Sequence, residues 1–273
     1  MHPTEQASPN RQRLATIHRW VRRGFIVWAV FVMGWLADSY RTRGVAPELL
    51  RSSEAVTVRS EADRLVFRPT ANERKTALVF FCGSGVAAEA YAPLLRPIAE
   101  QGYPVFVIRL PWRFAPLKAH KYAAYSDALD CIHDGASEIE HWVIAGHSLG
   151  GRLACMVLES HGDDLSGVVL LGTTHPKEKD LSSVATPVVK VYATNDGVAP
   201  PETVEANQRL LPATTTWVKI DGGNHSQFGH YGHQLLDGAA TISRDIQQGI
   251  ARDAIVDALR NAEENVAQPP STP

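Results

Sequence analysis

The most apolar part of the chain lies near its N-terminus. Residues 24–37 contain no charged side chain, and their only hydrogen-bonding side chains are the indoles of Trp28 and Trp35. As a helix this segment rises about 21 Å, against about 30 Å for the hydrocarbon core of a bilayer. A helix over residues 20–37 rises about 27 Å if Arg22 and Arg23 extend to the headgroups. The pattern predicts an N-terminal apolar helix that, over residues 24–37, is short for a membrane span and suits the apolar region of a signal peptide, and that approaches the length of a span when counted from Trp20.

Arginines flank this segment on both sides. The nearest are Arg11, Arg13, Arg19, Arg22 and Arg23 before it, and Arg41, Arg43 and Arg51 after it. The excess before the segment favours a cytoplasmic N-terminus with the remainder of the chain outside. Residues 22–26, Arg-Arg-Gly-Phe-Ile, also resemble the core of a twin-arginine export signal, but no clear cleavage site follows.

Three interpretations of the N-terminal region therefore stay open. Residues 1–45 form a membrane anchor or uncleaved signal, a cleaved signal, or a buried helix or hydrophobic hairpin arm. We expect membrane contact through residues 20–37, and a protein that is membrane-anchored or exported with its catalytic domain outside the cytoplasm.

Strand-like and helix-like patterns alternate over the rest of the chain. Short apolar runs predict strands at 55–58, 64–68, 76–81, 105–110, 142–145, 168–171, 188–192 and 215–220. Helical spacing of apolar residues predicts helices at 89–101, 121–132, 151–160 and 242–260. This alternation is typical of an α/β fold, with a mostly parallel sheet covered by helices on both faces.

One domain is expected over residues 46–260, followed by a disordered polar tail at 261–273. No repeat or linker divides the domain. Only about 16 residues separate the strands at 168–171 and 188–192, which leaves no room there for a large cap domain.

Charge and cysteine content exclude several classes of protein. A formal net charge of −2 argues against a nucleic-acid-binding protein. Three cysteines, Cys82, Cys131 and Cys155, form neither a disulfide framework nor a zinc motif. The spacing of His225, His230 and His233 does not match a helical metal motif, so neither a metal nor a cofactor is expected.

A motif of chemical interest occupies residues 146–151, Gly-His-Ser-Leu-Gly-Gly, between a predicted strand and a predicted helix. This is the G-x-S-x-G nucleophile elbow in its expected context. The glycines let strand and helix approach closely, and the turn presents the Ser148 hydroxyl at the edge of the sheet. The alternative is a glycine-rich helix start capped by Ser148.

A serine nucleophile needs a base and an acid that orients the base. Asp196 and His225 each follow a predicted strand and occur in the required order after Ser148. Asp180 and Asp221 are weaker candidates for the acid, and His230 and His233 are weaker candidates for the base. Taken alone, Asp196 is an ordinary turn residue and His225 an ordinary surface histidine.

Negative charge that develops on a substrate carbonyl needs hydrogen-bond donors. The N–H of Leu149, which follows the nucleophile, is one candidate for this oxyanion hole. The other comes from the loop after the strand at 76–81, where the choice between Ser84 and Gly85 favours Ser84. Trp112 and Phe228 are tentative pocket residues, because each lies near a strand end or beside His225.

Together these residues make 50–260 resemble an α/β-hydrolase of the small, capless branch that includes dienelactone-hydrolase-like and carboxylesterase-like proteins. The chain differs from many relatives in having Cys82 where they carry a histidine. It differs from dienelactone hydrolases proper in having serine rather than cysteine as the nucleophile. The departure at Cys82 concerns the oxyanion loop and not the triad, and the serine nucleophile means that the dienelactone reaction is not implied.

The resemblance implies a serine hydrolase that cleaves an ester-type bond in a small molecule through an acyl-enzyme on Ser148. An acyltransferase or thioesterase with the same triad is an alternative, because the acyl-enzyme step is common to all three. A non-catalytic, membrane-tethered binding module is the remaining alternative. Substrate identity and oligomeric state are left open.

Overall fold

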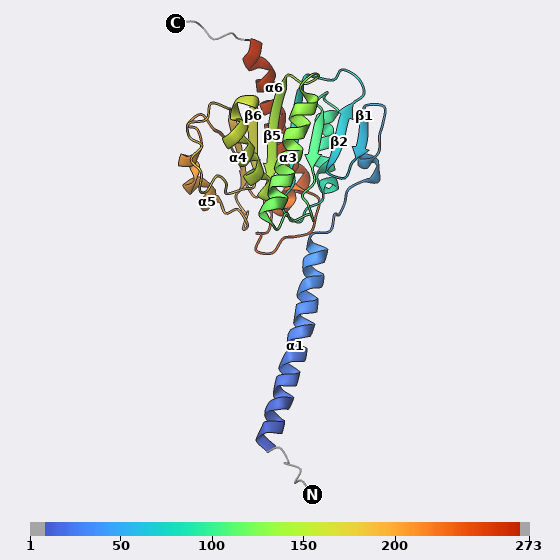
Figure 1. Ribbon diagram of the computed structural model, residues 1–273, viewed down its shortest axis with the longest axis vertical. Helices are drawn as coiled ribbons and strands as arrows, with labels where there is room; N and C mark the ends of the chain where they lie inside the picture. Colours follow the sequence, from blue (N-terminus) through green and yellow to red (C-terminus); the bar gives the residue numbers. More distant parts are fainter. Residues whose placement is uncertain (1–8, 268–273) are drawn as a thin grey trace.

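The computed structural model describes residues 9–267 of the chain. A long helix, α1 (Pro9–Ser39), projects as a single rod from an α/β body that contains the remaining elements (Figure 1). The body is built on eight strands: β1 (Val56–Ser60), β2 (Arg64–Pro69), β3 (Thr76–Phe81), β4 (Val105–Ile108), β5 (His141–His147), β6 (Gly167–Leu171), β7 (Val188–Ala193) and β8 (Thr216–Ile220).

The strands form one sheet in the order β1-β2-β4-β3-β5-β6-β7-β8. The six strands β4, β3, β5, β6, β7 and β8 pair in parallel, in that order. Only the pairs β1–β2 and β2–β4 are antiparallel. Every residue of β3 and of β6 is buried, as expected for central strands covered on both faces. The prediction of a mostly parallel sheet is confirmed.

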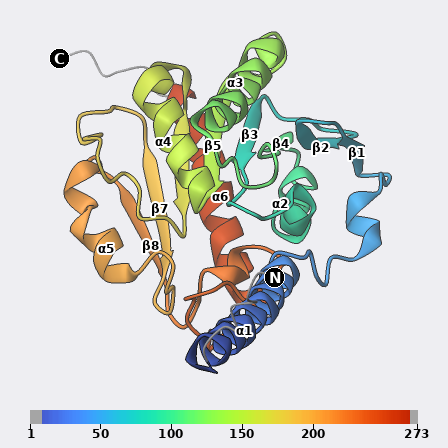
Figure 2. The same ribbon diagram turned by 60° about the horizontal axis from the view of Figure 1, so that its bottom comes forward.

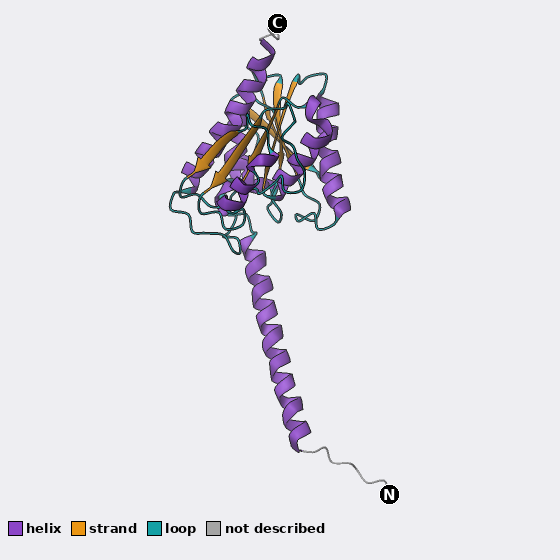
Figure 3. Ribbon diagram, turned by 90° about the vertical axis from the view of Figure 1, so that its left-hand side faces the viewer, coloured by secondary structure: helices purple, strands orange, loops and turns teal. Residues whose placement is uncertain are grey.

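Helices cover both faces of this sheet, which Figure 3 shows edge-on. Helices α3 (Lys118–Gly135) and α4 (Leu149–His161) pack together, and α4 covers β3, β5 and β6. Helices α2 (Ala92–Ala99) and α6 (Arg244–Ala267) form the other layer, and α6 also packs on β3, β5 and β6. A short helix, α5 (Pro201–Ala206), which sequence periodicity did not predict, lies beside β7.

The closing helix is longer than predicted. It ends at Ala267, so residues 261–267, expected to begin a polar tail, are helical, and residues 268–273 lie outside the described part. Two contacts explain the extension. Ala262 is buried, and Glu263 forms an ion pair with Arg74 at 2.8 Å.

The end of α1 contacts the body without a linker. Thr42 forms a β-bridge with Tyr231, and the Arg43 N–H donates to the His230 carbonyl at 2.9 Å. Figure 2 shows α1 beside the loop that connects β8 to α6. This loop follows the carboxyl end of β8, so α1 adjoins the edge of the sheet at which the parallel strands end.

One helix in the described chain, Thr16–Ser39, is long and apolar enough to cross a membrane. It has 24 residues and a mean hydropathy of 1.3, and none of its most apolar window is buried. A signal sequence near an N-terminus has the same length and composition, so the helix fits a signal anchor or a membrane span.

Candidate active site

Ser148 lies in a sharp turn between β5 and α4. Its φ of 56° and ψ of −116° fall outside the regions that residues with a Cβ normally adopt. The turn requires its two glycines. A Cβ on Gly146 would lie 2.2 Å from the Gly150 oxygen, and a Cβ on Gly150 would lie 2.2 Å from the Phe81 oxygen. The strained serine is fixed at the strand end by its N–H, which donates to the Leu171 carbonyl at 3.0 Å.

Asp196 and His225 meet beyond the ends of the neighbouring strands β7 and β8. Asp196 Oδ2 and His225 Nδ1 are 2.9 Å apart, and both side chains are buried. The other carboxylate oxygen accepts the N–H groups of Val198 at 2.9 Å and Ala199 at 2.6 Å. Because a carboxylate only accepts, Nδ1 of His225 is the donor, and the neutral ring keeps its lone pair on Nε2.

The Nε2 atom of His225 is buried and has no hydrogen-bond partner within residues 9–267. The His225 ring lies beside the ring of His147, with centroids 4.5 Å apart, and His147 directly precedes Ser148. Catalytic hydrogen bonds often tighten only when substrate binds. The arrangement therefore leaves one acceptor nitrogen free beside the elbow.

His147 links the elbow to the loop after β3. Its Nδ1 lies 2.8 Å from the Tyr91 hydroxyl, which also accepts the Gly83 N–H at 2.9 Å. Burial, and then the proximity of His225, hold the pKa of His147 well below its usual value. The ring is therefore neutral and accepts the Tyr91 proton. Sequence reasoning missed Tyr91, because its role depends on contacts between residues far apart in the chain.

Asp237 is a second residue that sequence reasoning missed. Its Oδ1 accepts the His225 N–H at 3.0 Å, and its Oδ2 accepts the Ser226 N–H at 2.8 Å and the Ser226 hydroxyl at 2.6 Å. Asp237 thus fixes the backbone of the histidine loop, whereas Asp196 binds the histidine side chain. An Asp-Gly pair at 237–238 marks a turn in the sequence, but nothing there indicates this role.

Two N–H groups remain available near Ser148. Leu149 is the first residue of α4, where N–H groups have no acceptor within the helix. In the loop after β3, the N–H of Gly83 donates to Tyr91 and that of Gly85 to the Arg113 carbonyl at 2.7 Å. The Ser84 N–H between them has no acceptor in the described part of the chain. Of the two candidates from this loop, Ser84 is therefore the one with a free donor.

The comparison with known families adds an independent observation. The family described as "Alpha/beta hydrolase family" matches residues 77–249, which include β3 through β8 and the start of α6. The chain belongs to the alpha/beta hydrolase family. No curated protein sequence matches the hydrolase.

Several solved structures share its fold. A ferulic acid esterase from Streptomyces cinnamoneus is 18% identical, with a TM-score of 0.57, over 71% of this chain and 68% of that one. An alpha/beta hydrolase from the metagenome of sediments from the lagoon of Mar Chica, Morocco, is 20% identical, with a TM-score of 0.51, over 62% and 89%. A metagenome-derived lipolytic enzyme is 12% identical, with a TM-score of 0.52, over 73% and 98%. At such identities the likeness concerns the fold alone.

The two candidate pocket residues of the hydrolase differ in exposure. Trp112 is 78% exposed at the tip of the loop after β4, whereas Phe228 is fully buried with its ring 5.3 Å from that of His147. Among the weaker candidates, Asp221 forms a surface ion pair with Lys219. The ring nitrogens of His230 are buried without partners in the described region.

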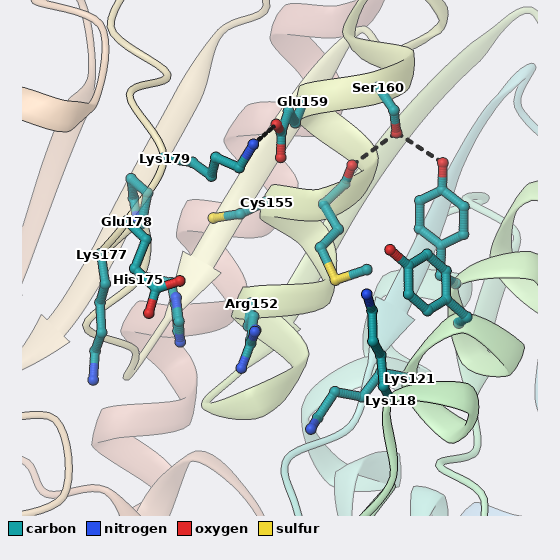
Figure 4. A pocket seen from close by; sticks show the side chains of 14 residues that line it. Lys118, Lys121, Arg152, Cys155, Glu159, Ser160, His175, Lys177, Glu178 and Lys179 are labelled. Atoms are coloured by element: carbon teal, nitrogen blue, oxygen red, sulfur yellow. Dashed lines mark hydrogen bonds and ion pairs between the residues drawn. The ribbon is translucent and has the colours of Figure 1, made fainter.

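One pocket of the hydrolase lies beside the elbow rather than over it. It has a volume of about 590 Å³ and lies between α3, α4 and the loop after β6. Its lining is rich in cations, and Figure 4 shows Lys118, Lys121, Arg152 and Lys177 below the Glu159–Lys179 ion pair. None of Ser148, Asp196 and His225 lines it.

No group of three or more His, Cys, Asp or Glu side chains in the described chain could hold a metal ion. The three cysteines are free and buried. Burial raises the pKa of the Cys131 thiol to about 11 and that of Cys155 to about 12, so both stay protonated near neutral pH.

Proposed function

We propose that the hydrolase cleaves an ester-type bond through an acyl-enzyme on Ser148, with His225 as the base and Asp196 as the acid that orients it. The observation that carries the proposal is the buried Asp196–His225 pair, whose free Nε2 lies beside the strained elbow. A turn as strained as that of Ser148 is characteristic of functional sites, since a folded chain seldom keeps such strain elsewhere.

In the first half-reaction the Ser148 Oγ bonds to the ester carbonyl carbon while its proton moves to His225 Nε2. The carbonyl electron pair moves to oxygen, which the N–H groups of Leu149 and Ser84 would stabilise. When the carbonyl re-forms, the bond to the alcohol oxygen breaks and that oxygen takes the proton from Nε2. Asp196 holds the ring tautomer and stabilises the charged imidazole between these steps.

In the second half-reaction a water molecule replaces the alcohol. His225 Nε2 takes a proton from the water as its oxygen bonds to the acyl carbon. The bond to Ser148 Oγ then breaks, Oγ recovers the proton, and the acid leaves. A different acyl acceptor at this step would give the acyltransferase reaction instead.

The proposal also includes a membrane anchor. Helix α1 is exposed along its apolar length, which is unfavourable in water but favourable in a bilayer. The excess of arginines before residue 24 favours a cytoplasmic N-terminus, which puts the single hydrolase domain on the other side of the membrane.

Labelling with a fluorophosphonate tests the nucleophile. We expect the full chain to be labelled and Ser148→Ala to escape labelling. Ser160→Ala is the matched control, because Ser160 is an exposed serine on the same helix, α4, and should leave labelling unchanged. Labelling of Ser148→Ala, or none of the folded wild-type chain, would refute the proposal.

Kinetics test the other two residues. Asp196→Asn should lower the turnover of a soluble ester by about four orders of magnitude, because asparagine favours the wrong histidine tautomer. His225→Ala should have an effect of similar size. A panel of esters and thioesters of different chain lengths would then identify the acyl group and the bond that is cleaved.

A further inference from the structure

The exposed hydrophobic side chains of the hydrolase body are confined to one edge. Within the described body, the large ones are Trp112, Phe114, Leu117, Tyr122, Leu235, Leu236 and Ile246. They occupy the loops after β4 and β8 or the first turns of α3 and α6. All of these segments lie at the carboxyl edge of the sheet, where Ser148 also lies. The two most exposed, Trp112 at 78% and Leu236 at 80%, are at loop tips.

Helix α1 ends at this same edge. Only two residues, Tyr40 and Arg41, separate its last residue, Ser39, from the β-bridge at Thr42. At about 3.5 Å per residue, this connection can extend by no more than about 10 Å. If α1 crosses the bilayer, the edge that carries Ser148 is therefore held against the bilayer surface.

Contacts of Tyr40 fix the loop that carries Trp112 to the end of α1. The Tyr40 ring meets the ring of Phe114 edge-on, with centroids 5.3 Å apart. The Arg113 guanidinium donates to the Tyr40 carbonyl at 2.9 Å. The loop tip is thereby placed at the level where the apolar part of α1 ends, which is where tryptophan side chains favour the membrane interface.

Four cationic side chains lie near this edge of the sheet, on the side covered by α3 and α4. Lys118 and Lys121 are in the first turn of α3, Arg152 is in the first turn of α4, and Lys177 is in the loop after β6 (Figure 4). No ion pair is recorded for these four side chains in the described chain, whereas Lys179 is paired with Glu159. Burial, and then Lys177, Arg152 and Lys190, lower the pKa of His175 in the same pocket to about 4. Five cationic side chains and two carboxylates, Glu159 and Glu178, line this pocket, so its lining carries a net positive charge that favours anionic headgroups.

We propose that the carboxyl edge of the sheet is a membrane-docking surface, with Trp112 and Leu236 entering a bilayer of anionic lipids and Ser148 acting on an acyl ester held in that bilayer. The proposal rests on the proposed function, because it needs both the anchor and the serine nucleophile. A bilayer fits this surface better than a protein partner does, since the end of α1, the exposed loop tips at Trp112 and Leu236 and the cationic side chains without ion pairs all lie at the carboxyl edge of the sheet.

Spin labels on the full chain test the docking. The chain is reconstituted in phosphatidylcholine vesicles with phosphatidylglycerol, and a label is attached to Leu236→Cys. The control is Asp163→Cys, an exposed position after α4 at the opposite edge of the sheet. The native thiols are buried and do not compete for the label.

We expect the label at 236 to be accessible to oxygen and protected from a water-soluble nickel chelate, and the label at 163 to show the reverse. Removing phosphatidylglycerol should increase nickel access at 236. Equal nickel access at both positions overturns the proposal. Protection at 236 from both the nickel chelate and oxygen indicates burial against protein, such as a second copy of the chain, and also overturns it.

A double variant, Leu235→Gln with Leu236→Asn, tests the substrate. Both side chains are exposed, at 54% and 80%, and asparagine tolerates the φ of 70° at position 236. Turnover of a short soluble ester should stay unchanged, while that of the same acyl ester in vesicles should fall about tenfold, because docking is weakened. An equal fall for both substrates overturns the proposal.

These outcomes are separate from those that test the proposed function. If the wild-type chain cleaves no ester and takes no fluorophosphonate, the proposed function fails even where the label at 236 lies in lipid. If the chain cleaves the soluble ester but the label at 236 lies in water, the docking proposal alone fails.

Discussion

Gly150 lies so close to the end of β3 that a Cβ on it would come within 2.2 Å of the Phe81 carbonyl oxygen. Gly150→Ala should therefore lower the free energy of unfolding by about 3 kcal/mol or more, because backbone cannot yield as a side chain can. Urea denaturation measures the change.

Gly249 is the matched control, because it lies inside α6 and an added Cβ would meet nothing within 4 Å. Gly249→Ala should raise the free energy of unfolding by about 0.5–1 kcal/mol, since glycine is less favourable than alanine within a helix. Equal effects of the two substitutions would contradict the steric argument.

Tyr91→Phe tests the connection between the elbow and the loop after β3. The substitution removes a buried hydroxyl and leaves the Gly83 N–H and His147 Nδ1 without their partner. The expected cost is about 1–3 kcal/mol of stability. Tyr125→Phe is the contrasting variant, because the hydroxyl that it removes forms a hydrogen bond with Ser160 near the surface. We expect this variant to change the free energy of unfolding by no more than about 0.5 kcal/mol. A stable Tyr91→Phe variant would show that the network contributes little.

Asp237→Asn tests how the histidine loop is positioned. An amide at 237 turns an NH₂ group toward either the His225 N–H or the Ser226 donors, so one hydrogen bond becomes a repulsion. Turnover should fall about tenfold or more through misplacement of His225, while Ser148 should still be labelled by fluorophosphonate, though more slowly. Asp221→Asn, which affects only an exposed ion pair, should leave both unchanged. Unaltered turnover in Asp237→Asn would exclude a positioning role.

Histidines with lowered pKa values make stability depend on pH. Burial and nearby charges lower the pKa of His147 well below its usual value and that of His175 to about 4. Below about pH 6.5 the unfolded histidines bind protons that the folded ones do not, so the free energy of unfolding falls as the pH falls.

For the fully buried His147 the slope approaches about 1.4 kcal/mol per pH unit below pH 6.5. Urea denaturation between about pH 7.5 and 5.5 measures it, above the range in which most carboxylates titrate. His175→Gln should make the profile less steep, because one proton is no longer taken up on unfolding. A stability that does not change over this interval would contradict the prediction.

The positions of the strands and the elbow could be predicted from the sequence because both depend on local patterns. The continuous apolar run at 76–81 predicts a strand that is buried on both faces, and such a strand lies in the middle of a sheet. The spacing of Gly146, Ser148 and Gly150 permits few turns other than the elbow. Asp196 and His225 could be placed because each directly follows a strand, and parallel strands end at one edge. Their pairing at 2.9 Å follows from that topology.

Tyr91 and Asp237 could not be found in this way. Each acts on a residue that the fold brings to it, through hydrogen bonds that leave no periodicity in the chain. The length of α6 was missed for a similar reason, since the residues after 260 are polar and the helix continues there through the burial of Ala262 and the Arg74–Glu263 ion pair. The exposure of Trp112 and the burial of Phe228 likewise depend on packing that the sequence pattern does not encode.

If α1 spans a membrane as proposed, the short connection between Ser39 and Thr42 limits where the hydrolase can meet its substrate. A flexible tether would let the body sample a volume of solution, whereas a connection of two residues keeps it close to the membrane surface. On the proposed topology, encounters with substrate then depend on lateral diffusion in a single leaflet, the one that faces the body. The rate of turnover would follow the surface density of substrate in that leaflet rather than its bulk concentration.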